Sequence, residues 1–122
     1  MKQLTKAEEE LMQVLWKLEK AFVKEVIEEL PEPKPAYNTV STIIRILEKK
    51  GFVDHEAFGK TYRYYPLVAS SDYQKQSMKT LLKSYFGNSI SNLVSFFAKE
   101  GELSQKEMKE LEELIKSHKH DS

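Results

Sequence analysis

A change of periodicity at Gly51 constrains the fold more than any other feature of this sequence. In the preceding stretch, YNTVSTIIRILEKK, the apolar residues recur at the spacing of one buried helix face. The following stretch, FVDHEAFGKTYRYYPLV, is rich in aromatic and β-branched residues on either side of Gly59. Glycine suits the left-handed position that ends a helix. The sequence therefore predicts a helix over 37–50 that runs directly into a β-hairpin with strands over 52–57 and 61–66.

Helical patterns occupy the rest of the chain. Thr5 and Glu8 have capping-box spacing and open a helix expected from Lys6 to Leu18. A second, short helix ends against the prolines of PEPKP, which force an extended connection. After the hairpin the chain turns helical again from Ser70, and capping-box spacings recur at Ser71 with Gln74 and at Ser104 with Glu107.

This order predicts a mostly α fold with a small β-hairpin. Three helices followed by a hairpin form a winged helix-turn-helix domain, which we expect over residues 1–68. Residues 69–122 hold three short amphipathic helices, too little chain for a stable core alone, so we expect a helical dimerisation segment that pairs with a second copy. Its predicted contact residues are Leu81, Tyr85, Leu93, Phe96, Phe97, Leu111 and Leu114.

Charge and composition bound the class of protein. The formal net charge is zero, yet residues 34–67 carry six basic against three acidic side chains. The lack of cysteine excludes disulfides and thiolate metal sites and fits a reducing compartment. The N-terminal stretch is too charged for a secretory signal, and no apolar run approaches the roughly 18 residues of a membrane span. We therefore predict a cytoplasmic protein that does not insert into membranes.

The polar face of the 37–50 helix is a candidate base-reading surface. Asn pairs with adenine, Ser and Thr hydroxyls contact base edges, and Arg or Lys contacts guanine or phosphate. The candidates are Asn38, Ser41, Thr42, Arg45 and Lys49. An ordinary solvent-exposed helix face is the alternative, and the hairpin that follows favours DNA. Asn38 has two possible uses, because it is also a better N-cap than Ala36.

The hairpin supplies candidate phosphate contacts. Lys60 lies at its expected tip and Arg63 on its second strand. Tyr62, Tyr64 and Tyr65 alternate with these cations, and their hydroxyls could add neutral phosphate contacts. Alternation allows only one set to face outward, so Tyr64 or its neighbours are expected in the core rather than at a ligand. The sequence contains no catalytic motif and no histidine pair at metal-ligand spacing, so we predict no enzyme, no cofactor and no metal site.

A family resemblance covers essentially the whole chain. NTVSTIIRILEKKGFVDHEAFGKTYRYYPLV resembles the recognition helix and wing of the penicillinase repressor (BlaI/MecI-like) family of winged-helix transcriptional repressors. That family's first two helices are similar to the stretch LTKAEEELMQVLWKLEKAFVKEVIEEL, in which Trp16 stands at a characteristic aromatic position. Its dimerisation segment is similar to the stretch NSISNLVSFFAKEGELSQKEMKELEELI.

The resemblance implies a homodimeric repressor of a palindromic operator with TACA/TGTA-type half-sites. It implies recognition-helix contacts from Asn38, Thr39, Ser41, Thr42 and Arg45, with wing contacts near Lys60 and Arg63. In a well-known member, lysine stands at the position of Asn38 and arginine at that of Ser41, so this helix is less cationic.

The resemblance also implies how repression is relieved. In the antibiotic-responsive members of the family, a membrane-bound sensor metalloprotease triggers cleavage of the repressor at an Asn-Phe bond. The matching positions in this sequence are Phe96 and Phe97, so phenylalanine replaces the asparagine. The alternative for both residues is helical core at the dimer interface. The competing function for the whole chain is a winged-helix module that presents its polar helix to a protein.

Overall fold

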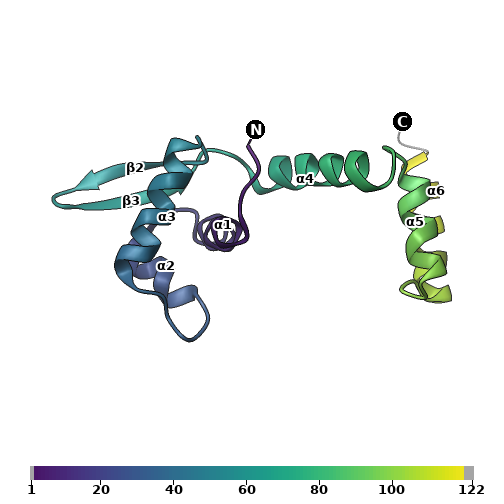
Figure 1. Ribbon diagram of the computed structural model, residues 1–122, viewed down its shortest axis with the longest axis horizontal. Coiled ribbons are helices and arrows are strands. Elements are labelled where there is room, and N and C mark those ends of the chain that lie inside the picture. Colours follow the sequence, from purple (N-terminus) through teal and green to yellow (C-terminus); the bar gives the residue numbers. More distant parts are fainter. Residues whose placement is uncertain (1, 120–122) are drawn as a thin grey trace. The chain divides into compact units, whose positions relative to one another are not determined.

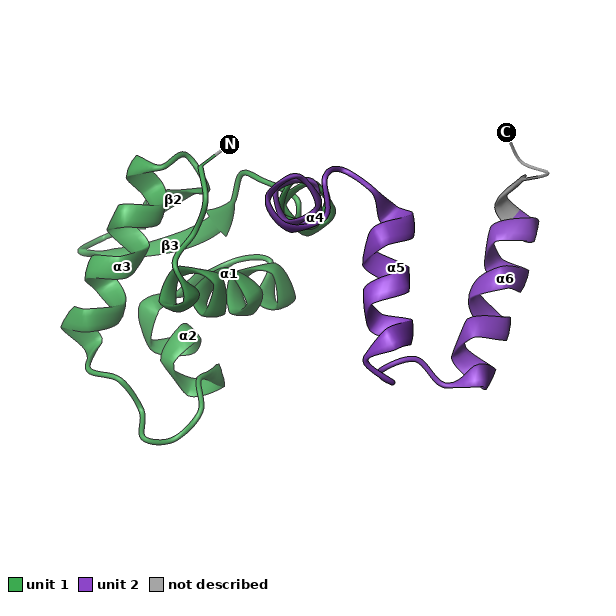
Figure 2. Cartoon of the chain, turned by 45° about the vertical axis from the view of Figure 1, so that its right-hand side comes forward, with its two compact units in different colours: residues 1–77 green, residues 78–122 purple. Residues whose placement is uncertain are grey.

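The computed structural model describes the backbone of residues 2–119. Its elements, in chain order, are α1 (Lys6–Leu18), β1 (Ala21–Phe22), α2 (Val23–Glu29), α3 (Tyr37–Lys49), β2 (Val53–Phe58), β3 (Thr61–Pro66), α4 (Ser70–Tyr85), α5 (Ile90–Lys99) and α6 (Gln105–Lys119). The chain forms two compact units, residues 1–77 and 78–122, which are coloured separately in Figure 2. The first unit holds three helices and the sheet, and the division falls inside α4.

Helix starts follow local hydrogen-bonding chemistry. The Thr5 hydroxyl accepts from the Glu8 N–H at 3.2 Å, while the Glu8 carboxylate accepts from the Thr5 N–H at 2.8 Å, so the predicted capping box is confirmed. Ser104 and Glu107 form the same reciprocal pair at 3.1 and 3.2 Å. The capping box expected at Ser71 and Gln74 was wrong, because α4 begins at Ser70 and Ser71 therefore lies inside the helix.

The predicted junction at Gly51 is confirmed. Lys50 follows α3 as its C-cap, and Gly51 takes the left-handed φ of 84°. The backbone N–H of Phe52 then donates to the Leu47 carbonyl at 3.0 Å, which holds the buried Phe52 ring in the core. This bond explains why β2 begins at Val53, one residue later than expected. Figure 1 shows the chain passing from α3 into the β2–β3 hairpin.

The sheet has a third strand that was not expected from the sequence. The strand order is β1-β3-β2, and β1 pairs antiparallel with β3 through Ala21 with Tyr64 and Phe22 with Arg63. A strand of two residues is too short to show a period-two pattern. The pairing puts Ala21 and Tyr64 on the same face of the sheet, and both side chains are buried. The strand β1 therefore adds to the sheet face that packs in the core.

The core of the first unit is formed by one face of each of its elements. Fully buried side chains come from all three helices and from the sheet; they include Met12, Leu15, Val26, Val40, Ile44, Leu47, Phe52 and Val53. The start of α4 joins this core through Tyr73, which is 6% exposed and packs against Trp16 and Phe52. The Trp16 indole N–H donates to the Val68 carbonyl at 2.8 Å. The first unit therefore continues beyond residue 68, where the predicted domain ended.

The second unit has no buried side chain among its described residues, 78–117. Large apolar side chains on all three of its helices are exposed; they include Tyr85, Ile90, Phe96, Phe97, Leu114 and Ile115. The other predicted contact residues, Leu81, Leu93 and Leu111, are partly buried. A monomer rarely leaves so much apolar surface in contact with water. Across residues 2–119, no helix combines the length and the apolar character needed to cross a membrane.

Candidate nucleic-acid interface

The outer face of α3 carries most of the predicted base-reading residues. Asn38, Thr39, Thr42, Arg45 and Lys49 are all exposed. Three of them, at positions 38, 42 and 45, follow one another at helical spacing, so they lie on one stripe opposite the buried Val40, Ile44 and Leu47. The Thr42 hydroxyl donates to the Asn38 carbonyl at 2.8 Å, which fixes its rotamer and leaves the hydroxyl oxygen as an acceptor.

The structure settles the two uses of Asn38 in favour of an available side chain. The N-cap of α3 is Ala36, which makes no side-chain capping bond, and Asn38 lies one residue inside the helix. Its amide is exposed and makes no recorded hydrogen bond to the described residues. Asn38 therefore keeps both its donor and its acceptor for a partner molecule.

Ser41 lies differently from its predicted neighbours. It is 8% exposed, and its hydroxyl oxygen is 3.4 Å from an Arg45 guanidinium nitrogen. The position falls on the flank of α3 that faces the hairpin rather than on the outer stripe. A direct base contact from Ser41 stays a prediction, while its observed contact orients Arg45.

The two wing cations differ in how much of their charge is available. Lys60 is exposed at the turn beside Gly59, and no acidic partner within the described residues is recorded for it. Arg63 is paired with Glu56 at 3.3 Å and lies over the Phe58 ring at 4.8 Å. Since Arg63 already has an ionic and an aromatic partner, Lys60 is the better placed of the two for a phosphate.

The sheet presents an aromatic face to α3. Of the three hairpin tyrosines, Tyr64 is the buried one at 3% exposed, so the expectation of a tyrosine in the core is confirmed at that position. Burial, with a smaller contribution from the Glu48 carboxylate, raises the pKa of Tyr64, and its hydroxyl therefore stays protonated at neutral pH. A hollow of about 120 Å³ lies between α3 and this face, and Arg45 and Lys60 are among the residues that line it. That volume is well below the roughly 300–1,000 Å³ of sites for drug-sized ligands.

Sequence reasoning missed two exposed residues beside this surface, and it left open which hairpin tyrosines face solvent. Tyr37 and Ile46 on α3 are 47% and 40% exposed, and Tyr62 on β3 is 46% exposed. Tyr62 shares its face of the strand with Tyr64, so the alternation pattern could have placed it toward α3. The pattern could not show that the sheet buries one ring and leaves the other in solvent.

The base of α3 is fixed to α1 by an ion pair. Lys50 donates to both Glu8 carboxylate oxygens, at 2.7 and 2.9 Å, and the Glu8 side chain is only 6% exposed. Burial acts to raise the pKa of Glu8, but the Lys50 hydrogen bond, the Thr5 N–H and the Lys50 charge together lower it below its ordinary value. Lys50 therefore stabilises the fold and is not a cation of the outer stripe.

The positions implied for cleavage lie within α5. Phe96 and Phe97 are 49% and 41% exposed, and their rings contact each other with centroids 5.8 Å apart. The Phe96 ring also meets Phe86 at 5.7 Å. The bond between Phe96 and Phe97 is helical and lies in the last turn of α5.

Comparison with known proteins identifies the family. The model of the family described as penicillinase repressor matches residues 4–117. The methicillin resistance regulatory protein MecI of Staphylococcus aureus (strain N315) is 32% identical over 114 residues, which cover 93% of each chain. The penicillinase repressor of Bacillus licheniformis is 30% identical over 118 residues, covering 96% of this chain and 92% of that one.

A solved structure agrees with the fold of the first unit. The solution structure of the DNA-binding domain of the repressor BlaI has a TM-score of 0.51 and 36% identity, and it covers 58% of this chain and 88% of that chain. The predicted winged helix-turn-helix fold is thus confirmed. The family consists of repressors and not of enzymes, in agreement with the lack of a catalytic motif. The chain belongs to the penicillinase repressor family.

Proposed function

We propose that this protein is a DNA-binding transcriptional repressor that reads operator bases with the outer face of α3. One observation carries the proposal: Asn38, Thr42 and Arg45 form an exposed stripe of hydrogen-bonding side chains on the third helix of a winged-helix unit. Helices in this position enter the major groove, where such side chains distinguish base pairs. One relative of known structure is the DNA-binding domain of the repressor BlaI.

Phosphate contacts complete this interface. Lys49 at the end of α3 and Lys60 at the hairpin turn are exposed cations that flank the stripe. Contacts of this kind fix the register of a protein on the duplex but carry no sequence information. The operator is expected to be palindromic, with TACA/TGTA-type half-sites, as the family resemblance implies.

Homodimerisation through the second unit is part of the same proposal. The exposed aromatic and aliphatic side chains of α4, α5 and α6 would be covered by the same helices of a second copy. Two linked recognition units bind more tightly than one, because the second binding event becomes intramolecular. This arrangement lets a subunit of zero net charge bind DNA through two local cationic faces.

The family resemblance is the basis for a further part of the proposal, the relief of repression. A membrane-bound sensor metalloprotease would trigger cleavage between Phe96 and Phe97. Proteases bind extended substrates, whereas this bond lies inside α5. Cleavage there therefore requires local unwinding of the helix, and exposure of both rings makes such opening less costly than in a buried helix.

Selection from a pool of random DNA duplexes tests the proposal. The full chain should enrich one motif made of two inverted half-sites, as a two-fold dimer requires. The variant Asn38→Ala should lose preference at one position of each half-site, while Lys106→Ala on α6 should select the same motif as the parent. Failure to enrich any motif would favour the competing protein-interaction module and contradict the DNA-binding proposal.

A further inference from the structure

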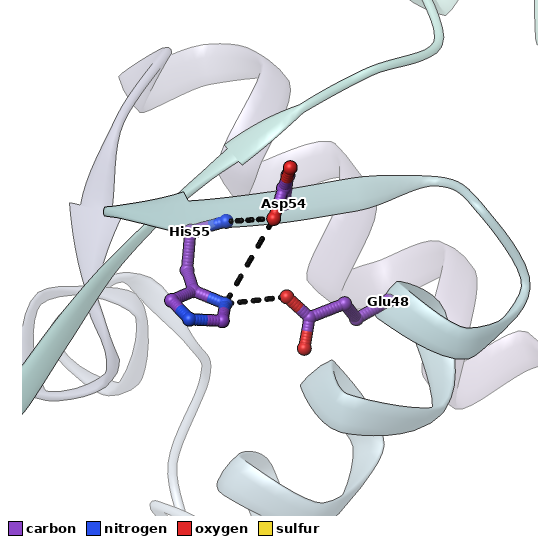
Figure 3. A group of neighbouring side chains, drawn as sticks. All are labelled: Glu48, Asp54 and His55. Carbon is purple, nitrogen blue, oxygen red and sulfur yellow. Dashed lines mark hydrogen bonds and ion pairs between the residues drawn. The ribbon is translucent and has the colours of Figure 1, made fainter. Parts of the chain in front are cut away.

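Three potential metal ligands meet where the recognition helix joins the wing. Glu48 lies in the last turn of α3, and Asp54 and His55 lie at the start of β2, on the other side of Gly51. The His55 Nδ1 atom is 2.5 Å from a Glu48 carboxylate oxygen and 3.9 Å from an Asp54 carboxylate oxygen. Figure 3 shows the imidazole pointing toward Glu48, with Asp54 turned back over the same nitrogen.

A backbone hydrogen bond explains how the side chains of two successive strand residues come together. Side chains at successive strand positions leave on opposite faces, so Asp54 and His55 would ordinarily diverge. Here the Asp54 carboxylate accepts from the backbone N–H of His55 at 2.8 Å, which curls it toward the imidazole. One ligand atom from each of the three residues then lies within 4.8 Å of the other two.

These distances suit a first-row divalent metal ion. Zinc binds imidazole nitrogen and carboxylate oxygen at about 2.0–2.2 Å, which separates tetrahedral ligands by about 3.4 Å. The observed separations of 2.5 and 3.9 Å lie on either side of that value. Side-chain shifts on the order of 1 Å would therefore place all three atoms around one ion, with a fourth position for water.

The surroundings hold the imidazole in place. The His55 ring stacks on Tyr62, with centroids 4.2 Å apart, and is tilted against Tyr64 at 5.7 Å. The Glu48 and His55 side chains are each 30% exposed, so the cluster is accessible to a solvated ion yet partly walled by apolar rings. No Lys or Arg pairs with Glu48 or Asp54 among the recorded ion pairs of the described residues.

We propose that Glu48, Asp54 and His55 form a binding site for a divalent transition-metal ion, with Zn²⁺ as the best-matched probe. Imidazole together with carboxylate favours zinc over magnesium, which prefers all-oxygen octahedral sites. An ion bound there would tie the end of α3 to the start of β2 and cancel the two negative charges beside the recognition surface. The site would thus stiffen the angle between recognition helix and wing.

Zinc titration of the full chain by calorimetry tests the site. Both remaining histidines lie near the C-terminus, outside the residues whose side chains are described, so the parent for all variants carries His118→Ala and His120→Ala and retains His55 alone. This parent should bind one Zn²⁺ per chain and show no Mg²⁺ binding at the same concentrations. Glu48→Gln and His55→Phe, which keep side-chain size and the ring stack, should each weaken Zn²⁺ binding by at least about tenfold.

A matched control lies on the same strand. Glu56 faces the opposite side of the sheet and is paired with Lys20 and Arg63, so Glu56→Gln should bind Zn²⁺ as the parent does. Zinc should also raise the midpoint of thermal unfolding followed by Trp16 fluorescence in the parent and in Glu56→Gln, but not in His55→Phe. Absence of binding in the parent, or equal affinity in His55→Phe, would overturn the proposal.

Discussion

Replacing Glu8 by glutamine tests how the recognition helix is held on its domain. Glu8 caps α1 through the Thr5 N–H and also accepts two hydrogen bonds from Lys50 at the end of α3. Glutamine keeps the side-chain length and an oxygen for the capping bond, but it removes the negative charge opposite Lys50. The change therefore isolates the link between α1 and α3.

The size of the effect follows from burial. A hydrogen bond to a charged group contributes about 1.5–3 kcal/mol, and leaving a fully buried charge unpaired costs about 3–5 kcal/mol. The Lys50 side chain is 24% exposed, so water still reaches its ammonium group after the partner charge is removed. The cost of the substitution is therefore closer to that of losing one charged hydrogen bond than to that of burying an unpaired charge. We expect the free energy of unfolding of the first unit to fall by about 2 kcal/mol at pH 7.

Urea unfolding followed by Trp16 fluorescence measures this loss, since the single tryptophan lies in the first unit. The pKa of Glu8 is lowered in the folded state relative to the ordinary value of 4.5. Its ionised form therefore stabilises the fold fully above that value, and the stabilisation is lost as pH falls through the folded pKa. The difference between the parent and Glu8→Gln should accordingly shrink below pH 4.5.

The control is Glu10→Gln, which changes an exposed glutamate on the same helix and should alter stability by no more than about 0.5 kcal/mol. Equal stability of Glu8→Gln and Glu10→Gln at pH 7 would refute the reasoning. A difference between Glu8→Gln and the parent that persists unchanged at pH 3 would also refute it, because the effect would then not depend on the Glu8 charge.

Three further substitutions test other parts of the account. Tyr73→Phe keeps the ring but removes hydroxyl contacts to Glu9 at 2.7 Å and to the Leu4 N–H at 3.3 Å, and should lower the urea-unfolding free energy by about 1–2 kcal/mol. No loss would show that these two contacts do not stabilise the first unit. Phe97→Ser should shift sedimentation equilibrium toward monomer, and an unchanged dimer would remove Phe97 from the interface. Lys60→Ala should lower DNA affinity and reduce the slope of log affinity against log salt by about 1, whereas an unchanged slope would exclude a phosphate contact there.

The junction at Gly51 was predictable because its signals are local. Helical spacing, a glycine stop and strand alternation each depend on a few neighbouring residues, and they located α3, β2 and β3 to within one residue. The strand Ala21–Phe22 could not be found in this way, since its pairing partner Tyr64 is more than forty positions away. Tertiary pairing and not intrinsic preference makes that dipeptide a strand.

The outer stripe was predictable for the same reason, but the use of each polar side chain was not. Helical spacing placed Asn38 and Arg45 correctly, while Ser41 lies on the flank covered by the hairpin. Arg63 looked like a wing cation, yet the sheet register sets it beside Glu56 and Phe58. Whether a charge is available to DNA depends on its cross-strand neighbours, which only the register reveals.

Salt-dependent DNA binding of the full chain and of Arg45→Ala tests the central claim most directly. On the duplex recovered by selection, the affinity of the parent should fall steeply and linearly on a log–log plot against salt. Arg45→Ala should bind about ten times more weakly or worse, with unchanged urea unfolding, and Lys106→Ala should match the parent. Affinity that is independent of salt, or equal in Arg45→Ala and the parent, would contradict the assignment of α3 as the DNA-reading helix.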